Sequence, residues 1–229
     1  MLNSDGLGRV LIAGGASGLG SDVADAVAAA GGQPIVMDLV APRRAHVHFA
    51  VDLADTAMTE SVVEFIAADG LDAVVTCAAI DSWGPLKTVE TQHWERVVPV
   101  NRMGTASVIR ASLGALLESQ GQVVTVASTA DCHALPGASA CCASMFDVVG
   151  LPRGLNAEIG HRLGITCVMP GGMDTPFLNG RPQKYRPAVG APLMDPADVA
   201  QVIVDILRRR GWANVPEIML APVGETSWP

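Results

Sequence analysis

Short apolar runs alternate with longer helical stretches along the whole chain. Runs rich in Val and Ile predict strands at 9–13, 34–38, 46–51, 73–77, 122–127, 165–169 and 217–220. The stretches between them predict helices at 18–30, 57–68, 91–118, 139–161 and 196–209. Strands that alternate with helices are joined by right-handed crossovers. We therefore expect an α/β fold with one doubly wound parallel sheet and helices on both of its faces.

Two segments depart from this regular pattern. The stretch 170–196 is rich in Pro and Gly and is the longest irregular one; it has room for a short helix. We expect its part 176–195 to form a lid over a substrate site. The predicted helix 139–161 contains Pro152, which costs roughly 3 kcal/mol in an unkinked helix, so a kink or a break is expected there. No linker or repeat divides the 229 residues, and we expect a single domain over 1–229.

Composition excludes several classes of protein. Hydrophobic residues make up 49% and charged residues 17%, which suits a sheet buried on both faces. A net charge of -8 argues against a nucleic-acid surface, and no stretch approaches the roughly 18 apolar residues of a membrane span. The first nine residues lack the pattern of a secretion signal, and the five irregularly spaced cysteines are typical of reduced thiols. A cytoplasmic location is expected.

A glycine-rich turn follows the first predicted strand. Gly14, Gly18 and Gly20 give the spacing G-x-x-x-G-x-G, and Gly18 opens the next predicted helix. Glycines let the backbone approach a pyrophosphate, and the N–H groups at the start of a helix attract an anion. The turn therefore indicates a Rossmann-type dinucleotide site, although any turn from a strand to a helix favours glycine.

Aspartates follow at the ends of the next two predicted strands. Asp38 lies 18 residues after Gly20, where a carboxylate can accept hydrogen bonds from ribose hydroxyls and would repel a 2′-phosphate. It favours NAD over NADP, although Arg43 and Arg44 follow closely and could bind such a phosphate. Asp52 could meet the adenine, or it could be an ordinary turn aspartate.

In these motifs and their order the chain resembles the short-chain dehydrogenase/reductase family. Asn101 matches the helix asparagine of that family, Ser128 its catalytic serine, and Pro170-Gly171 with Thr175 the stretch that holds the nicotinamide carboxamide. The resemblance implies an NAD(H)-binding oxidoreductase acting on a small alcohol or carbonyl substrate. The cofactor contacts that it implies are Gly14, Ser17, Gly18, Leu19, Gly20, Asp38, Asp52, Leu53, Ala78, Met145, Pro170, Gly171 and Thr175.

The chain departs from the family at two positions. The family's tyrosine exchanges a proton with the substrate oxygen, and its lysine lowers the tyrosine pKa and binds the ribose. Cys141, 13 residues after Ser128, stands at the tyrosine position, and Met145 stands at the lysine position. A thiol is too short to reach a substrate held by Ser128. The usual proton transfer, worth about 10²–10⁴ in rate, should therefore be severely impaired.

Replacement groups are sought in the loop after the fifth strand. His133 has a side chain whose pKa suits proton transfer at neutral pH, although an exposed loop histidine is the alternative. Asp81, which follows the fourth predicted strand, is a weaker candidate. The catalytic candidates are thus Ser128, Asn101, Cys141 and His133. Cys141 as a covalent nucleophile would need an activating base. No metal site is expected, because Cys132, His133, Cys141 and Cys142 lack the C-x₂₋₄-C spacing of structural zinc sites.

Three functions stay open at this point. The first is an oxidoreductase with an altered proton relay through Ser128 and water. The second is a redox-neutral cyclase, isomerase or dehydratase in the same pocket, and the third is a non-catalytic NAD-binding or partner subunit. The expected partners are a small-molecule substrate and further copies of the chain, in a homodimer or homotetramer built on the helices 91–118 and 139–161.

Overall fold

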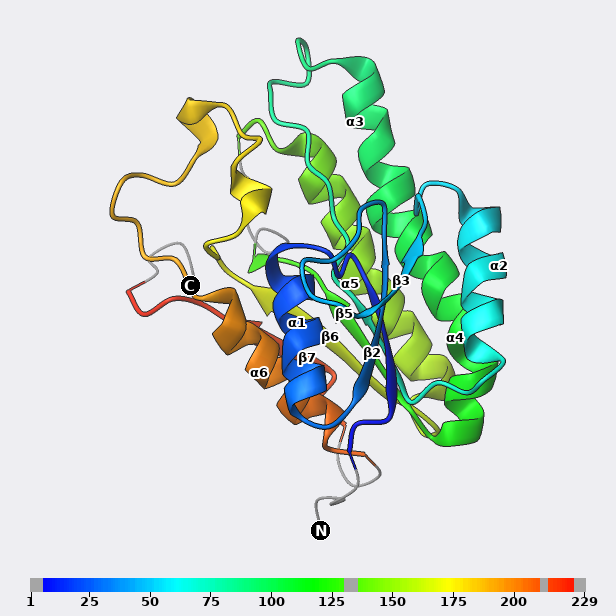
Figure 1. Ribbon diagram of the computed structural model, residues 1–229. Helices are drawn as coiled ribbons and strands as arrows, with labels where there is room; N and C mark the ends of the chain where they lie inside the picture. The colour runs from blue at the N-terminus through cyan, green and yellow to red at the C-terminus, as the bar shows by residue number, and fades with distance from the viewer. Residues whose placement is uncertain (1–5, 130–135, 211–213, 225–229) are drawn as a thin grey trace.

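The computed structural model describes residues 6–129, 136–210 and 214–224 (Figure 1). Within these ranges the chain forms a seven-stranded sheet in the order β3-β2-β1-β4-β5-β6-β7, and every neighbouring pair is parallel. The strands are β1 Arg9–Ala13, β2 Gln33–Asp38, β3 Val47–Ala50, β4 Ala73–Thr76, β5 Gln122–Val126, β6 Gly164–Pro170 and β7 Glu217–Leu220. The predicted doubly wound parallel sheet is confirmed.

Helices cover both faces of this sheet. They are α1 Gly18–Ala29, α2 Thr56–Ala67, α3 Thr91–Val98, α4 Thr105–Ser119, α5 Ser139–Ile159 and α6 Pro196–Leu207. Helices α1 and α6 lie side by side on one face, and α2, α4 and α5 lie on the other (Figure 1).

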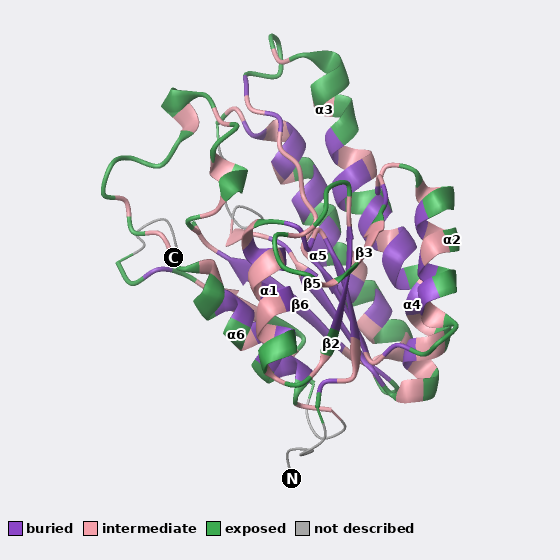
Figure 2. Ribbon diagram, in the orientation of Figure 1, coloured by how far each residue is buried: buried purple, intermediate pink, exposed green. Residues whose placement is uncertain are grey.

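The sheet has two apolar faces because successive side chains of a strand point to opposite sides. In β1, Val10 and Ile12 pack with α1 and α6, whereas Leu11 packs with α2 and α4. Figure 2 shows the central strands largely buried and the outer sides of the helices exposed, whereas the edge strands β3 and β7 contain only intermediate and exposed residues. Burial on both sides explains why the strands read as continuous apolar runs.

Strand order determines where a ligand can bind. From β1 the chain runs to β2 and β3 on one side, and then crosses to β4 on the other side of β1. The carboxyl ends of parallel strands share one edge, and a crevice opens where the order reverses. The ends of β1, β2, β4, β5 and β6 therefore border a single region of the molecule.

Helix α5 corrects one expectation. It continues without a break through Pro152, so the predicted break is wrong, whereas the alternative of a kink stays a prediction. Pro152 is buried together with Val148, Val149 and Leu155 on the same helix. Burying each large apolar side chain contributes about 1.5–3 kcal/mol, which offsets the roughly 3 kcal/mol that an internal proline costs.

The predicted helix 91–118 is helical throughout but not regular. A π-helical segment, η1 Pro99–Gly104, separates α3 from α4. Proline has no N–H to donate to the preceding turn, and a π segment accommodates an extra residue at such a point.

The segment after β6 forms the predicted irregular loop. It holds two short 3₁₀ turns, Pro176–Leu178 and Gln183–Tyr185. Its base is closed by a bridge between Met173 and Met194. Most of the loop is exposed, and it projects beyond α1 and α6 (Figure 2). No helix in the described part of the chain is long and apolar enough to span a membrane.

Candidate functional site

A cavity of about 630 Å³ lies at the carboxyl edge of the sheet. Its lining reaches from Asp38, at the end of β2, to Ser128, which follows β5. All thirteen residues predicted to contact a cofactor line this one cavity. The loop after β6 contributes Pro176, Phe177, Leu178, Arg181 and Pro187 to its wall. The sheet thus brings the residues predicted for the cofactor and the catalytic candidates Ser128 and Cys141 to one cavity.

The glycine turn between β1 and α1 exposes the start of the helix to the cavity. Gly14 has φ 80°, and a Cβ there would lie 2.5 Å from the backbone of Ala78, so the turn requires glycine. Ser17 is the N-cap residue of α1, yet its side chain makes no capping hydrogen bond. The first N–H groups of α1 are therefore not capped by that side chain and can receive an anion.

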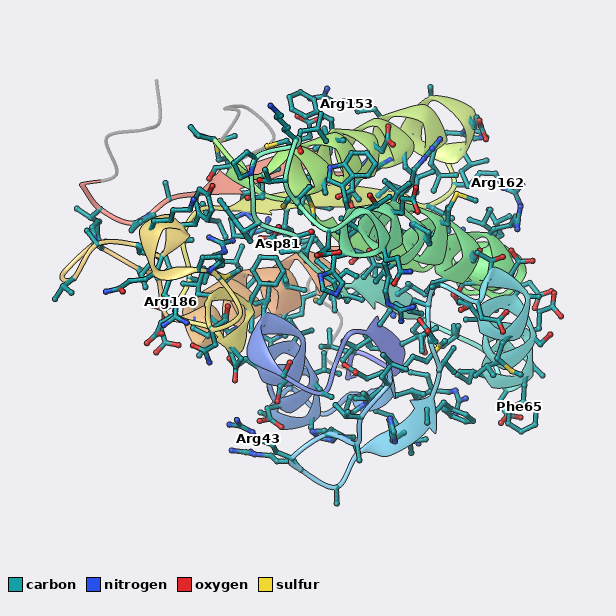
Figure 3. All side chains as sticks on the ribbon, turned by 90° about the horizontal axis from the view of Figure 1, so that it is seen from above. Arg43, Phe65, Asp81, Arg153, Arg162 and Arg186 are labelled. Carbon is teal, nitrogen blue, oxygen red and sulfur yellow. The ribbon has the colours of Figure 1, made fainter. Side chains whose placement is uncertain are left out.

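Asp38 is held against this turn. One of its carboxylate oxygens accepts a hydrogen bond from the Ala16 N–H at 3.0 Å, and the other accepts one from the Val40 N–H at 3.3 Å. Arg44 forms an ion pair with Asp25 at 3.1 Å, and Arg43 points away from the body of the molecule (Figure 3). Neither arginine lines the cavity.

Asp52 lines the same part of the cavity but has partners of its own. It accepts hydrogen bonds from the Ala54 N–H at 3.0 Å and from Arg96 at 2.8 Å. The bond from Arg96 holds the pKa of this carboxyl below its usual value. These contacts fit the turn interpretation, and the position in the cavity wall fits the adenine interpretation.

The other half of the cavity is mainly apolar. Cys141 and Met145 lie one turn apart on α5, are 6% and 5% exposed, and both line the cavity together with Ser128. They belong to a cluster of buried apolar side chains that also contacts Trp83. His133, Asp131 and Cys132 lie outside the described residues.

A charged and aromatic cluster closes this half, and sequence reasoning did not anticipate it. The Arg181 guanidinium forms an ion pair with Asp81 at 3.4 Å. Its central carbon lies 4.2 Å from the centre of the Trp83 ring and 5.3 Å from that of Phe177. Burial raises the pKa of Asp81, and Arg181 opposes that shift in part. Burial likewise lowers the pKa of Arg181, and Asp81 opposes that shift.

Comparison with known proteins places this site in a family. A model of the short chain dehydrogenase family matches residues 9–186. The chain belongs to this family. The matched residues include the glycine turn, the end of β5 and α5, all of which line the cavity.

Two curated relatives and one solved structure illustrate the similarity. A D-threitol dehydrogenase of Mycolicibacterium smegmatis is 34% identical over 167 residues, which are 66% of this chain and 64% of that protein. A (3R)-3-hydroxyacyl-CoA dehydrogenase of Rattus norvegicus is 30% identical over 174 residues, which are 71% of this chain and 67% of that protein. The ligand-free aldohexose dehydrogenase of Thermoplasma acidophilum superposes with a TM-score of 0.85 at 19% identity, over 95% of this chain and 92% of that one. The last similarity shows the shared fold.

Asn101, predicted to be catalytic, lies in the π segment and does not line the cavity. Its side-chain oxygen accepts a hydrogen bond from the Ile80 N–H at 2.8 Å. Its amide donates to the Ile80 carbonyl at 2.9 Å and to the Ser144 hydroxyl at 3.0 Å. Asn101 therefore fastens the loop after β4 to the helix that carries Cys141 and Met145, and its part in catalysis stays a prediction.

Replacing Asn101 by alanine is expected to lower the free energy of unfolding by roughly 2–4 kcal/mol, because it leaves the N–H and the carbonyl of Ile80 without this partner and removes one bond to the Ser144 hydroxyl, which keeps its bond to the Cys141 carbonyl. Urea denaturation of the purified variant measures this loss. Ser144→Ala is the control, since it removes only one of the three Asn101 bonds, together with the bond from Ser144 to the Cys141 carbonyl. A loss in Asn101→Ala no larger than that in Ser144→Ala would contradict the fastening role.

Cys77 also lines the cavity, and burial raises the pKa of its thiol to about 12. It is therefore a neutral thiol at physiological pH. Among the residues that the structure describes, no group of three or more His, Cys, Asp or Glu side chains is arranged to hold a metal ion.

Proposed function

We propose that the protein is an NAD(H)-dependent oxidoreductase of a small alcohol or carbonyl substrate, in which Cys141 and Met145 stand where the family has its tyrosine and lysine. One observation carries this proposal. A single cavity is lined both by the glycine turn with Asp38 and by Ser128, Cys141 and Met145. A dinucleotide that lies along the strand ends would extend from the first group to the second.

The residues present fit such a cofactor. The start of α1, at Gly18 to Gly20, would receive the pyrophosphate, and Asp38 would accept hydrogen bonds from the ribose hydroxyls. Pro170, Gly171 and Thr175 would border the nicotinamide carboxamide. When bound, the nicotinamide supplies the acceptor or the donor of a hydride.

Fewer groups would take part in proton transfer here than the family's usual set provides. Ser128 provides a hydroxyl that can donate a hydrogen bond to the substrate oxygen. The Cys141 thiol extends less far than a phenol would, and Met145 brings no charge to the ribose. The space beside Cys141 is available to water, and we propose that the proton travels through Ser128 and water.

Cofactor binding tests the first half of this proposal. Titration calorimetry is expected to show NADH binding more tightly than NADPH, because the Asp38 carboxylate repels a 2′-phosphate. Asp38→Ala should weaken NADH binding about tenfold through the loss of charged hydrogen bonds to the ribose. Asp25→Asn is the control, because Asp25 contacts Arg44 and does not line the cavity. Failure of the wild type to bind either nucleotide at millimolar concentration would overturn the proposal.

Turnover tests the second half. Absorbance at 340 nm across a panel of alcohols and ketones is expected to reveal slow hydride transfer. Ser128→Ala should reduce its rate about 10²-fold, the usual loss for one donor to a developing oxyanion. Thr129→Val is the matched control, since it removes a neighbouring hydroxyl. Activity that survives in Ser128→Ala would contradict the proposed proton route, and a nucleotide-binding protein without hydride transfer would be redox-neutral or non-catalytic.

A further inference from the structure

The charges in the cavity wall are unevenly placed. Four of the described lining residues carry a charge, namely Asp38, Asp52, Arg96 and Arg181. The first three belong to the half proposed for the adenosine, where Arg96 is paired with Asp52 at 2.8 Å. Arg181 contacts Trp83 and Phe177 and interacts electrostatically with Cys141. It is thus the one charge that the described lining presents to the reaction half.

The guanidinium of Arg181 has more donors than its surroundings satisfy. Its side chain is 15% exposed and its Nε is buried without a hydrogen-bond partner among the described residues. Asp81 approaches another nitrogen at 3.4 Å, and the same carboxylate oxygen also accepts a hydrogen bond from the Trp83 ring nitrogen. Its second oxygen accepts one from the Ser82 N–H at 2.8 Å. A buried charged donor without a partner is costly, and such a group often marks a ligand position.

Arg181 is also held in place before any ligand arrives. Trp83 stacks on its guanidinium, and the Tyr185 ring in turn lies 5.2 Å from that of Trp83. A planar guanidinium fixed in this way loses little freedom when it binds a carboxylate with two parallel hydrogen bonds. Asp81 does not line the cavity. An incoming anion therefore meets the cation and not the carboxylate behind it.

We propose that the substrate carries a carboxylate that Arg181 binds, so that the substrate class is a small hydroxy acid or oxo acid. This inference rests on the proposed function, because it specifies what the same pocket receives. Arg181 has a donor beyond the nitrogen that is paired with Asp81, and the apolar remainder of the pocket matches a short carbon chain.

Binding of two unreactive probes tests the inference without turnover. Butanoate and butanamide have the same shape and differ in charge. Titration calorimetry, with and without NAD, is expected to show butanoate binding at least about tenfold more tightly, the least that a charged hydrogen bond contributes. Arg181→Met should abolish this preference. Arg186→Met should keep it, because Arg186 lies in the same loop and binds only the carbonyls of Arg181 and Asn179 in the described structure.

A variant of Asp81 distinguishes a substrate-binding role of Arg181 from a purely structural one. Asp81→Asn keeps the cation and removes the nearby negative charge, so butanoate should bind equally well or more tightly. If the ion pair were only structural, Asp81→Asn and Arg181→Met would weaken butanoate binding to a similar extent. The double variant Asp81→Asn with Arg181→Met contains no unpaired charge, and it should fold and bind both probes equally weakly.

Several results would overturn the inference. They are equal binding of the two probes by the wild type, no binding of butanoate, a preference that persists without Arg181, and loss of the preference in Asp81→Asn. Failure of the proposed function has a different signature, since the protein would then bind butanoate through Arg181 without binding NAD or transferring hydride.

Discussion

Replacing Cys141 by tyrosine together with Met145 by lysine is expected to raise the rate of hydride transfer by about 10²–10⁴-fold. This range is what a positioned general acid or base typically contributes. In the proposed register both side chains line the cavity one helical turn apart, so the phenol would extend toward the substrate held by Ser128. The ammonium would lower the tyrosine pKa and bind the ribose. Absorbance at 340 nm with NAD and the best substrate of the panel measures the gain.

A rotated pair on the same helix gives the matched control. Cys142 and Phe146 carry the same spacing, do not line the cavity, and Phe146 is 56% exposed. Cys142→Tyr with Phe146→Lys introduces the same residue types and should leave the rate unchanged. Each single substitution at 141 or 145 should gain less than the pair, because the lysine acts largely through the tyrosine. A double variant no faster than the wild type would contradict the proposed register.

The fold was predictable because its signals are local. Each strand is a short apolar run, and two helices begin after a capping aspartate, such as Asp195 before Pro196, whose side chain accepts a hydrogen bond from the Ala197 N–H at 2.9 Å. Pro152 shows where prediction from local signals fails. The cost of a proline inside a helix can be predicted locally, but the burial that offsets it comes from a sheet formed by distant segments.

The two halves of the site also differed in how far they could be predicted from the sequence. The glycine turn and Asp38 lie at the ends of adjacent strands, so their meeting follows from the strand order. Arg181 gave no signal, because an arginine in a loop rich in Pro and Gly is usually solvated. Only the folded loop brings it onto Trp83 and Asp81, which follow β4. Asn101 was identified by resemblance, whereas its three hydrogen bonds to Ile80 and Ser144 became visible only in the structure.

Removing the Arg181 guanidinium by Arg181→Met is expected to lower the free energy of unfolding by about 3–5 kcal/mol at pH 7, because it leaves the Asp81 carboxylate buried without a cation. The side chain of Asp81 is only 7% exposed, so water screens it little. Equilibrium urea denaturation of the wild type and the variant at several pH values measures the loss. Arg186→Met is the control, since it removes an exposed arginine of the same loop without leaving a buried charge.

The loss has a defined dependence on pH. Burial raises the pKa of Asp81 in the folded state above its unfolded value near 3.8, and without Arg181 it rises further. The folded state then binds a proton that the unfolded state releases. The contribution of Asp81 to stability is therefore fully present below about pH 4 and is lost as the pH rises through the folded pKa. Arg181→Met should accordingly differ less from the wild type at pH 5 than at pH 7. Asp81→Asn in the Arg181→Met background should recover most of the lost free energy of unfolding at pH 7, because it removes the unpaired charge. A double variant no more stable than Arg181→Met would show that the loss comes from the missing ring contacts instead.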